Sequence, residues 1–395
     1  MKIEKIYIGG WFQRTMLHLN EVYEFLQDGT SQLQLSEGRL AKNREVLGIT
    51  ELSLTVDGFE TIKFATHTGI NVKILEDGLI TISKDAGTKN NIQADLAEVT
   101  NYYEKIFSPA ISYLFSLGAP VPKELANIKT VFPYFIVLDN AKTSEIETLF
   151  TQMDEQKYAT YKNENFETYG GGKYFFINVK KEGFVKGLEQ YIEETMFFRE
   201  FKGQLHRYLN LHRIIWEEVE SLKEKSNIKR HEITANASRL NDIHKTINLV
   251  ETRINQMGTY FKTREAIAKS NADFKKFLGI MEYRYETIGN TLTYIKETWT
   301  MTKNYVVAAI KLFESLENRV TQKILNNMNI IFGVMLSSTL IGFLWSIKVF
   351  PTFSVWGLLY SAMILVCGFS AIKFIQFIST RGKLKISDKD YEKFK

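Results

Sequence analysis

The chain has 395 residues, of which 24% are charged, and its formal net charge at pH 7 is +5. This balance is too weakly basic to indicate direct binding of nucleic acid, for which a strongly basic surface would be expected. The single cysteine, Cys367, excludes a disulfide within the chain and predicts a reducing compartment. No sustained apolar segment follows the N-terminus, so no signal peptide is predicted.

Residues 1–182 predict an α/β domain that senses a ligand. Short strand-like runs alternate with turns, and the Asp-Gly pairs at 57–58 and 77–78 are typical of tight hairpins. The predicted strands are 3–8, 51–56, 61–65, 71–75, 79–83, 131–138 and 174–179, and the predicted helices are 14–26, 91–117 and 144–153. Because Pro109 falls inside the second helix, we expect an interruption there. Together these elements predict a mixed sheet with helices packed on it.

Residues 183–325 predict a long helical stalk. Two runs of apolar residues recur at steps of three and four, which is the seam of a coiled coil. The first run is Ile233, Leu240, Ile243, Ile247, Val250, Ile254, Met257 and Phe261; the second is Met281, Tyr285, Ile288, Leu292, Ile295, Trp299, Thr302, Val306, Ala309, Phe313, Leu316 and Val320. One antiparallel return helix would not cover so long a seam, so we expect a symmetric homo-oligomer.

Residues 326–379 predict two transmembrane helices, at about 328–347 and 355–378, and residues 380–395 form a basic tail. The first run carries no charge and the second carries only Lys373, and about 20 apolar residues of helix span a bilayer. The excess of Lys and Arg in the tail places both termini in the cytoplasm. We therefore expect a multi-pass protein of a bacterial inner membrane. The alternative is a buried helical hairpin in a soluble core, which normally shows a polar stripe.

One face of the first predicted span is polar or small in its cytoplasmic half and aliphatic in its outer half. Its residues are Asn326, Asn329, Gly333, Ser337, Leu340 and Leu344. In a ring of helices this face is expected to line a pore, because amides and hydroxyls replace ion hydration and leucines form a constriction. The alternative is close helix packing through the small residues. Neither span contains an acidic residue, so a carboxylate selectivity ring is excluded.

A candidate ligand site lies near the N-terminus, at Trp11, Phe12 and Arg14. These residues follow Gly9-Gly10 at a predicted strand-to-helix turn. A helix N-terminus attracts phosphate, and an indole stacks on a purine. The alternative is an ordinary turn with a tryptophan in the core.

A second candidate ligand residue is Lys173, which follows the glycines at 170–172. Its spacing differs from that of a phosphate-binding loop, and the glycines precede a strand, so a hairpin-like loop is the alternative. The histidines do not match a zinc motif, and the only cysteine lies in a predicted span. We therefore expect neither a metal centre, nor a resident cofactor, nor an enzymatic activity.

The layout of the chain resembles that of the CorA family of divalent-metal channels. The resemblance rests on an N-terminal α/β domain, a very long helix that continues into a first span, a second span and a basic tail. It covers nearly the whole chain but depends on no catalytic motif. CorA channels carry a Gly-Met-Asn tripeptide at the outer end of the first span, whereas this chain has Trp-Ser-Ile-Lys-Val-Phe at 345–350. The missing tripeptide and the lysine argue against magnesium transport.

A CorA-like chain without that tripeptide resembles the membrane effectors associated with type III CRISPR systems. The resemblance implies an antiviral channel, a pentamer being favoured, that opens when a nucleotide second messenger, the S-adenosylmethionine–AMP conjugate, binds the cytoplasmic domain. One alternative is a magnesium or cobalt transporter of the same fold. Another is a membrane anchor that displays an interaction domain.

Overall fold

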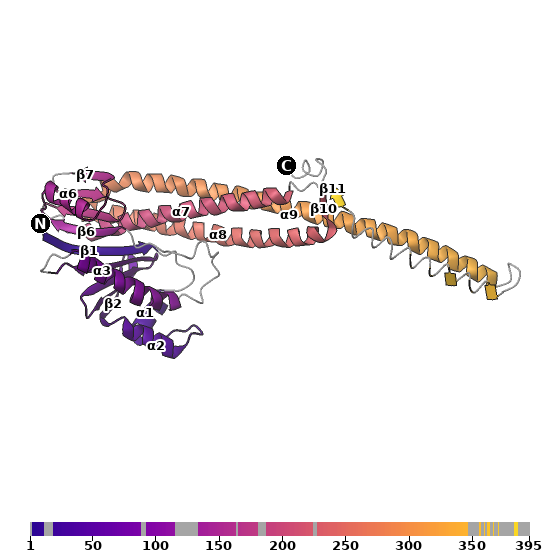
Figure 1. Ribbon diagram of the computed structural model, residues 1–395, viewed down its shortest axis with the longest axis horizontal. Helices are drawn as coiled ribbons and strands as arrows, with labels where there is room; N and C mark the ends of the chain where they lie inside the picture. Colours follow the sequence, from indigo (N-terminus) through magenta and orange to yellow (C-terminus); the bar gives the residue numbers. More distant parts are fainter. Residues whose placement is uncertain are drawn as a thin grey trace. The chain divides into compact units, whose positions relative to one another are not determined.

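A computed structural model describes residues 2–11, 19–87, 92–114, 133–162, 165–180, 187–223, 227–346 and 383–385, together with positions 355, 356, 359, 362, 363, 366 and 370. The chain is an α+β protein with an N-terminal sheet followed by long helices (Figure 1). It divides into two compact units. Unit 1 comprises Met1–Leu209 and Thr252–Lys296, and unit 2 comprises Asn210–Glu251 and Glu297–Lys395.

Unit 1 is built on a nine-stranded sheet with the order β2-β3-β4-β5-β1-β6-β9-β8-β7. The strands are β1 (Lys2–Trp11), β2 (Ile49–Asp57), β3 (Phe59–Thr66), β4 (Ile70–Leu75), β5 (Leu79–Asp85), β6 (Tyr134–Asp139), β7 (Ala159–Lys162), β8 (Phe166–Gly170) and β9 (Tyr174–Val179). Among the described strands, β6 and β9 are the only pair that runs in parallel. The sheet is therefore mixed, as the sequence predicts.

The strands β2 to β5 form a meander whose turns follow the predicted chemistry. Gly58 and Gly78 have φ angles of 80° and 96°. These left-handed conformations favour glycine, so the two Asp-Gly pairs hold the β2–β3 and β4–β5 turns. The turn chemistry thereby sets the register across this half of the sheet.

One face of the meander is covered by the helical segments α1 (Leu19–Asp28), α3 (Ile92–Tyr102), η1 (Tyr103–Phe107) and α4 (Ser108–Leu114). Strand residues such as Ile62, Phe64, Val72, Ile74 and Ile82 point to this face and are buried in the main apolar core. Because side chains alternate along a strand, their neighbours lie on the opposite face. That opposite face is polar, and it carries the candidate site.

The predicted interruption near Pro109 takes the form of a π-helical segment. The N–H of Ser108 donates to the carbonyl of Tyr103, five residues earlier, at the end of η1. Proline has no N–H to continue the α-helical ladder, and a π-turn accommodates the break without ending the helix.

Three long helices account for most of the remaining chain: α7 (Leu188–Lys223), α8 (Arg230–Ser270) and α9 (Lys275–Ser346). Every residue of the two predicted apolar runs is buried, from Ile233 to Phe261 in α8 and from Met281 to Val320 in α9. The steps of three and four therefore predicted the buried faces of both helices correctly. The shorter elements are α2 (Glu37–Val46), α6 (Thr143–Gln152) and the antiparallel pair β10 (Asn227–Lys229) and β11 (Lys383–Lys385).

The prediction of two transmembrane helices is contradicted. Within the described residues, no helix is both long enough and apolar enough to span a bilayer. This finding overturns the hairpin in the predicted fold class, the multi-pass inner-membrane localisation and the description of the chain as a membrane channel protein.

The first predicted span was chosen because residues 328–347 carry no charge, but Asn329, Ser337, Ser338 and Thr339 are polar although uncharged. Absence of charge is a weaker requirement than a sustained apolar surface, since each polar side chain opposes transfer into hydrocarbon. In the second predicted span, 355–378, only isolated positions are described.

Candidate functional site

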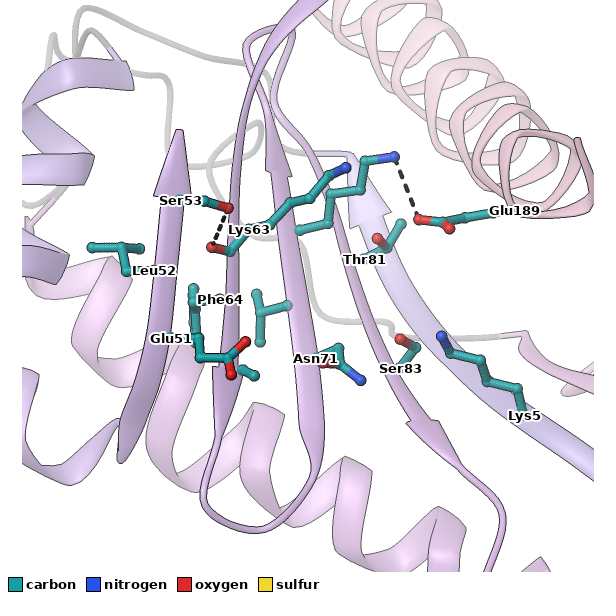
Figure 2. Close-up of a pocket in the computed structure, with 13 residues that line it drawn as sticks. Lys5, Glu51, Leu52, Ser53, Lys63, Phe64, Asn71, Thr81, Ser83 and Glu189 are labelled. Carbon is teal, nitrogen blue, oxygen red and sulfur yellow. Dashed lines mark hydrogen bonds and ion pairs between the residues drawn. The ribbon is translucent and has the colours of Figure 1, made fainter. Parts of the chain in front are cut away.

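A hollow of about 410 Å³ lies on the polar face of the meander (Figure 2). We call it the polar hollow. It is lined by Lys5, Glu51, Leu52, Ser53, Lys63, Phe64, Ala65, Asn71, Val72, Lys73, Thr81, Ser83 and Glu189. Its volume falls within the range of small-molecule sites. All of these residues belong to unit 1.

The strand register arranges the polar side chains of the hollow in two rows across the sheet. Ser53, Lys63, Lys73 and Thr81 are successive cross-strand partners on β2, β3, β4 and β5. Glu51, Ala65, Asn71 and Ser83 form the parallel row two residues along each strand. The first row thus places two lysines directly opposite one another, and like charges in that position destabilise a sheet.

Two carboxylates of helix α7 form ion pairs with Lys73. Its Nζ lies 2.6 Å from Oε1 of Glu193 and 3.4 Å from Oε1 of Glu189. Burial alone would lower the pKa of Lys73, but the attraction of Glu193 and Glu189 outweighs it and raises that pKa. Lys73 therefore stays charged inside the fold.

Lys63 is exposed and, within the described parts of the chain, forms no ion pair. On β2, the hydroxyl of Ser53 donates to the Lys63 carbonyl at 3.5 Å. Lys5, at the far side of the hollow, lies 3.8 Å from Asp85 and 5.3 Å from the centroid of the Tyr7 ring. Lys63 is thus the cation most open to an incoming anion.

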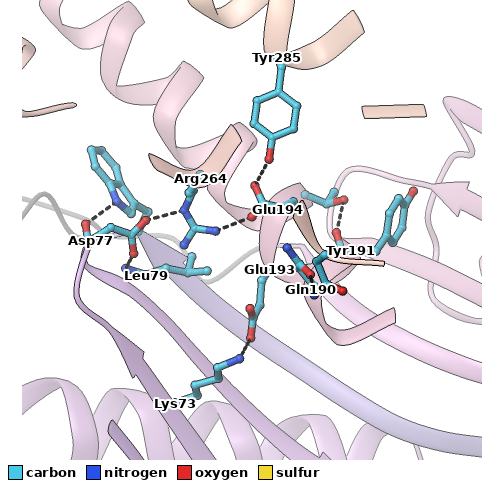
Figure 3. Close-up of polar contacts among 12 residues, drawn as sticks. Lys73, Asp77, Leu79, Gln190, Tyr191, Glu193, Glu194, Arg264 and Tyr285 are labelled. Atoms are coloured by element: carbon cyan, nitrogen blue, oxygen red, sulfur yellow. Dashed lines mark hydrogen bonds and ion pairs between the residues drawn. The ribbon is translucent and has the colours of Figure 1, made fainter. Parts of the chain in front are cut away.

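Unit 1 also contains a buried ionic network centred on Arg264 of α8 (Figure 3). Its Nε donates to Oδ2 of Asp77 at 2.5 Å, and its Nη1 donates to Oε1 of Glu194 at 2.8 Å. The hydroxyl of Tyr285, on α9, donates to the other oxygen of Glu194 at 2.8 Å. The network therefore joins the β4–β5 turn to three helices. We call these four residues the Arg264 network.

The partners of Arg264 hold its guanidinium in the charged form. Burial would lower the pKa of Arg264, but Asp77 and Glu194 outweigh it and raise that pKa above its ordinary value. Burial raises the pKa of Glu194, which Arg264 and Tyr285 only partly oppose. The guanidinium carbon also lies 4.4 Å from the centroid of the Phe197 ring. Arg264 Nη2 has no hydrogen-bond partner among the described atoms.

Of the predicted ligand residues near the N-terminus, only Trp11 lies within the described residues. Its side chain is 1% exposed, and its Nε1 donates to the carbonyl of Asp77 at 2.8 Å. Its ring packs against Phe197 and Phe201 at centroid distances of 5.7 and 5.5 Å. Trp11 therefore serves as a core residue that anchors the β4–β5 turn and offers no free face to a purine. Phe12 and Arg14 lie outside the described residues.

Lys173 lies in the loop between β8 and β9, away from the polar hollow. The backbone N–H groups of Gly172 and Lys173 donate to the carboxylate of Glu155 at 2.8 and 3.2 Å. An acidic side chain of the same chain thus occupies the position that a bound phosphate would take. This arrangement favours the alternative of a structural loop.

The predicted pore-lining residues all belong to α9. Asn326, Asn329, Gly333, Ser337 and Leu340 are exposed in the single chain, and Ser337 donates its hydroxyl to the Gly333 carbonyl at 2.7 Å. Leu344 belongs to the helix, but its side chain lies outside the described part. Their assignment to a pore stays a prediction.

Sequence reasoning missed Lys63 and Lys73 altogether. Both alternate with apolar residues on predicted strands, which was enough to place them on the polar face. Their cross-strand pairing needed the register of the whole meander. Within the described residues, no group of three or more His, Cys, Asp or Glu side chains is arranged to hold a metal ion.

The comparisons with known proteins add no assignment to this geometry. No known family model matches the chain, and no curated protein is detectably similar to it.

Proposed function

We propose that unit 1 binds a small anionic ligand in the polar hollow and that the chain acts as a ligand sensor. The observation that carries this proposal is the direct cross-strand pairing of Lys63 with Lys73 in a concave polar face. An anion placed between the two ammonium groups would relieve their repulsion and form charge-assisted hydrogen bonds.

The ligand class that best fits the hollow is a phosphate-bearing nucleotide. Lys63 and Lys73 supply cations for phosphate. Glu51 supplies a carboxylate elsewhere in the lining, and Glu189 supplies one beside Lys73, 3.4 Å from its Nζ. A ligand with both an anionic and a cationic group would satisfy both sets. The S-adenosylmethionine–AMP conjugate, implied by the family resemblance, has such a phosphate and a sulfonium group. It is therefore the first nucleotide to test.

The proposal concerns binding and not transport. Within the described residues no helix is long and apolar enough to span a bilayer, so transport is not proposed. Catalysis is not proposed, because the side chains of the hollow provide charge complementarity and hydrogen bonds without a paired nucleophile and base.

The test is isothermal titration calorimetry of the full chain with inorganic pyrophosphate, AMP, S-adenosylmethionine and the S-adenosylmethionine–AMP conjugate. Lys63→Met should weaken binding of the phosphate-bearing probes about 10- to 100-fold, because a hydrogen bond to a charged group contributes about 1.5–3 kcal/mol.

The matched control is Lys42→Met, which removes an exposed lysine of α2 outside the hollow and should leave affinity unchanged. The proposal is wrong if none of the four probes binds the wild-type chain. It is also wrong if Lys63→Met and Lys42→Met bind the phosphate-bearing probes equally well.

A further inference from the structure

Lys73 belongs to two environments at once. Its side chain is 21% exposed at the polar hollow, whereas the side chain of its closest partner, Glu193, is 6% exposed. The same ammonium group therefore serves as a ligand contact on one side and as the counter-ion of a buried carboxylate on the other. Anything that attracts Lys73 into the hollow acts on Glu193.

Few cations other than Lys73 act on the carboxylate of Glu193. The titratable groups that act on it from the surrounding elements are Tyr7 of β1, Lys73 of β4, Glu189 of α7 and Arg264 of α8. Burial raises the pKa of Glu193, Lys73 opposes that effect, and Glu189 adds to it. Arg264 is already paired with Asp77 and Glu194. Lys73 is thus the only cation in direct contact with Glu193 among the described residues.

A charge count shows why the position of Lys73 matters. Lys73 and Arg264 are two cations, and they face three buried carboxylates, Asp77, Glu193 and Glu194. With Lys73 drawn away, one cation would face three carboxylates in a region from which water is largely excluded. An uncompensated buried carboxylate takes up a proton in preference to remaining charged.

We propose that Lys73 couples occupancy of the polar hollow to the protonation of Glu193, so that binding of an anion draws one proton from solvent onto this buried carboxylate. This inference rests on the proposed function. The bound anion takes the ammonium group of Lys73 as its own partner, and the carboxylate of Glu193 becomes a neutral carboxylic acid by adding that proton.

Protonation of Glu193 takes place next to the contacts that join helices α7, α8 and α9. Glu193 is followed directly on α7 by Glu194, which contacts Arg264 of α8 and Tyr285 of α9 (Figure 3). Neutralising Glu193 removes one of the negative charges that act on Arg264. Binding in the hollow is thereby reported to the Arg264 network without direct contact between ligand and helix α8.

The test is infrared difference spectroscopy of the full chain at pH 7, in which a carboxylic acid gives a C=O band that a carboxylate lacks. The probe is inorganic pyrophosphate, with binding measured separately by calorimetry. Wild-type protein should gain one carboxylic acid band on adding pyrophosphate. Lys73→Met should show that band without any probe, and the double variant Lys73→Met/Glu193→Gln should lack it.

Lys63→Met is the matched control, since it removes the neighbouring cation but leaves the Lys73–Glu193 pair intact. It should show no band without probe, and it should need more pyrophosphate than the wild type to produce one. Pyrophosphate that binds wild type without a new band overturns the coupling and leaves the proposed function standing. Absence of pyrophosphate binding counts against both proposals for this probe. A Lys73→Met spectrum without the Glu193 band overturns the link between the two side chains, whether or not pyrophosphate binds.

Discussion

Arg264 shows how a buried charge depends on its partners. The side chain is 2% exposed and holds both Asp77 and Glu194, whose side chains are 0% and 3% exposed. Removing one member of such a set leaves uncompensated buried charge, which costs about 3–5 kcal/mol. We expect Arg264→Met to lower the free energy of unfolding of unit 1 by about that amount, as measured by urea denaturation.

Arg239 provides the comparison for this prediction. It pairs with Glu218 at 2.6 Å, but its side chain is 59% exposed. Pairs of this kind contribute about 0–1 kcal/mol, so Arg239→Met should change stability little. Equal losses for the two variants would show that burial does not govern the cost.

His212, on α7 in unit 2, predicts a pH dependence of stability. Its ring lies near those of Trp216 and Trp299, at centroid distances of 5.9 and 6.2 Å, and its Nε2 has no hydrogen-bond partner among the described atoms. Burial lowers the pKa of His212. The unfolded chain therefore binds a proton at this histidine at higher pH than the folded chain does, and stability falls as pH drops below about 6.5.

We expect His212→Phe to lose part of the fall in unfolding free energy that the wild type shows between pH 7 and pH 5. Urea denaturation at a series of pH values measures this difference. The exposed His206 is the control, and His206→Phe should retain the wild-type profile. A His212→Phe profile that parallels the wild type at every pH would contradict the prediction.

At the scale of single residues, the sequence predicted the turns better than the site. The Asp-Gly pairs are correct because their signal is local. The contact of Arg264 with Asp77 joins residues 187 positions apart, and no local pattern marks it. Trp11 was predicted as a ligand contact from the strand-to-helix turn around it, with a core tryptophan as the alternative. The alternative is correct, and the hydrogen bond that shows it joins Trp11 to a turn 66 positions away.

Two glycines of different elements test how packing decides the effect of one methyl group. Gly279 lies within α9, and a Cβ there would meet no atom within 4 Å. Gly9 lies in β1, where a Cβ would come within 2.4 Å of the Ile80 carbonyl oxygen. We expect Gly279→Ala to stabilise the protein by about 0.5–1 kcal/mol through helix propensity.

Gly9→Ala is expected to destabilise the protein by about 1–3 kcal/mol, because the strand must shift to accommodate the extra atom. Thermal unfolding of both variants beside the wild type gives the signs directly. If both substitutions shift stability in the same direction, helix propensity at Gly279 or the close contact at Gly9 does not have the expected effect.

At the scale of elements, periodicity was reliable where one face alone decides burial. The steps of three and four identified the buried faces of α8 and α9 because each helix buries a single stripe. The order of the nine strands could not be predicted from local patterns, since β1 pairs with β5 and β6, which are distant in sequence. The transmembrane prediction is contradicted within the described residues, which include only isolated positions of its second span.

At the scale of the whole molecule, the end of α9 exposes more apolar surface than a single chain normally leaves open. Its exposed large hydrophobic residues are Leu325, Met328, Ile330, Phe332, Val334, Leu336, Leu340, Phe343 and Trp345. Extended apolar surfaces of this kind mark sites of association. The predicted homo-oligomer would bury this surface between copies of the chain.

We therefore expect the wild-type chain to sediment as a homo-oligomer in analytical ultracentrifugation, a pentamer being favoured by the family resemblance. Phe332→Glu combined with Leu336→Glu places two charges one turn apart on α9 and should shift the chain toward monomer. Met301→Glu is the control, because Met301 is 60% exposed on the same helix but lies outside the run at 325–345. A wild-type chain that is monomeric at micromolar concentration would contradict the homo-oligomer. An oligomer of unchanged mass in the double variant would place the interface on another part of the chain.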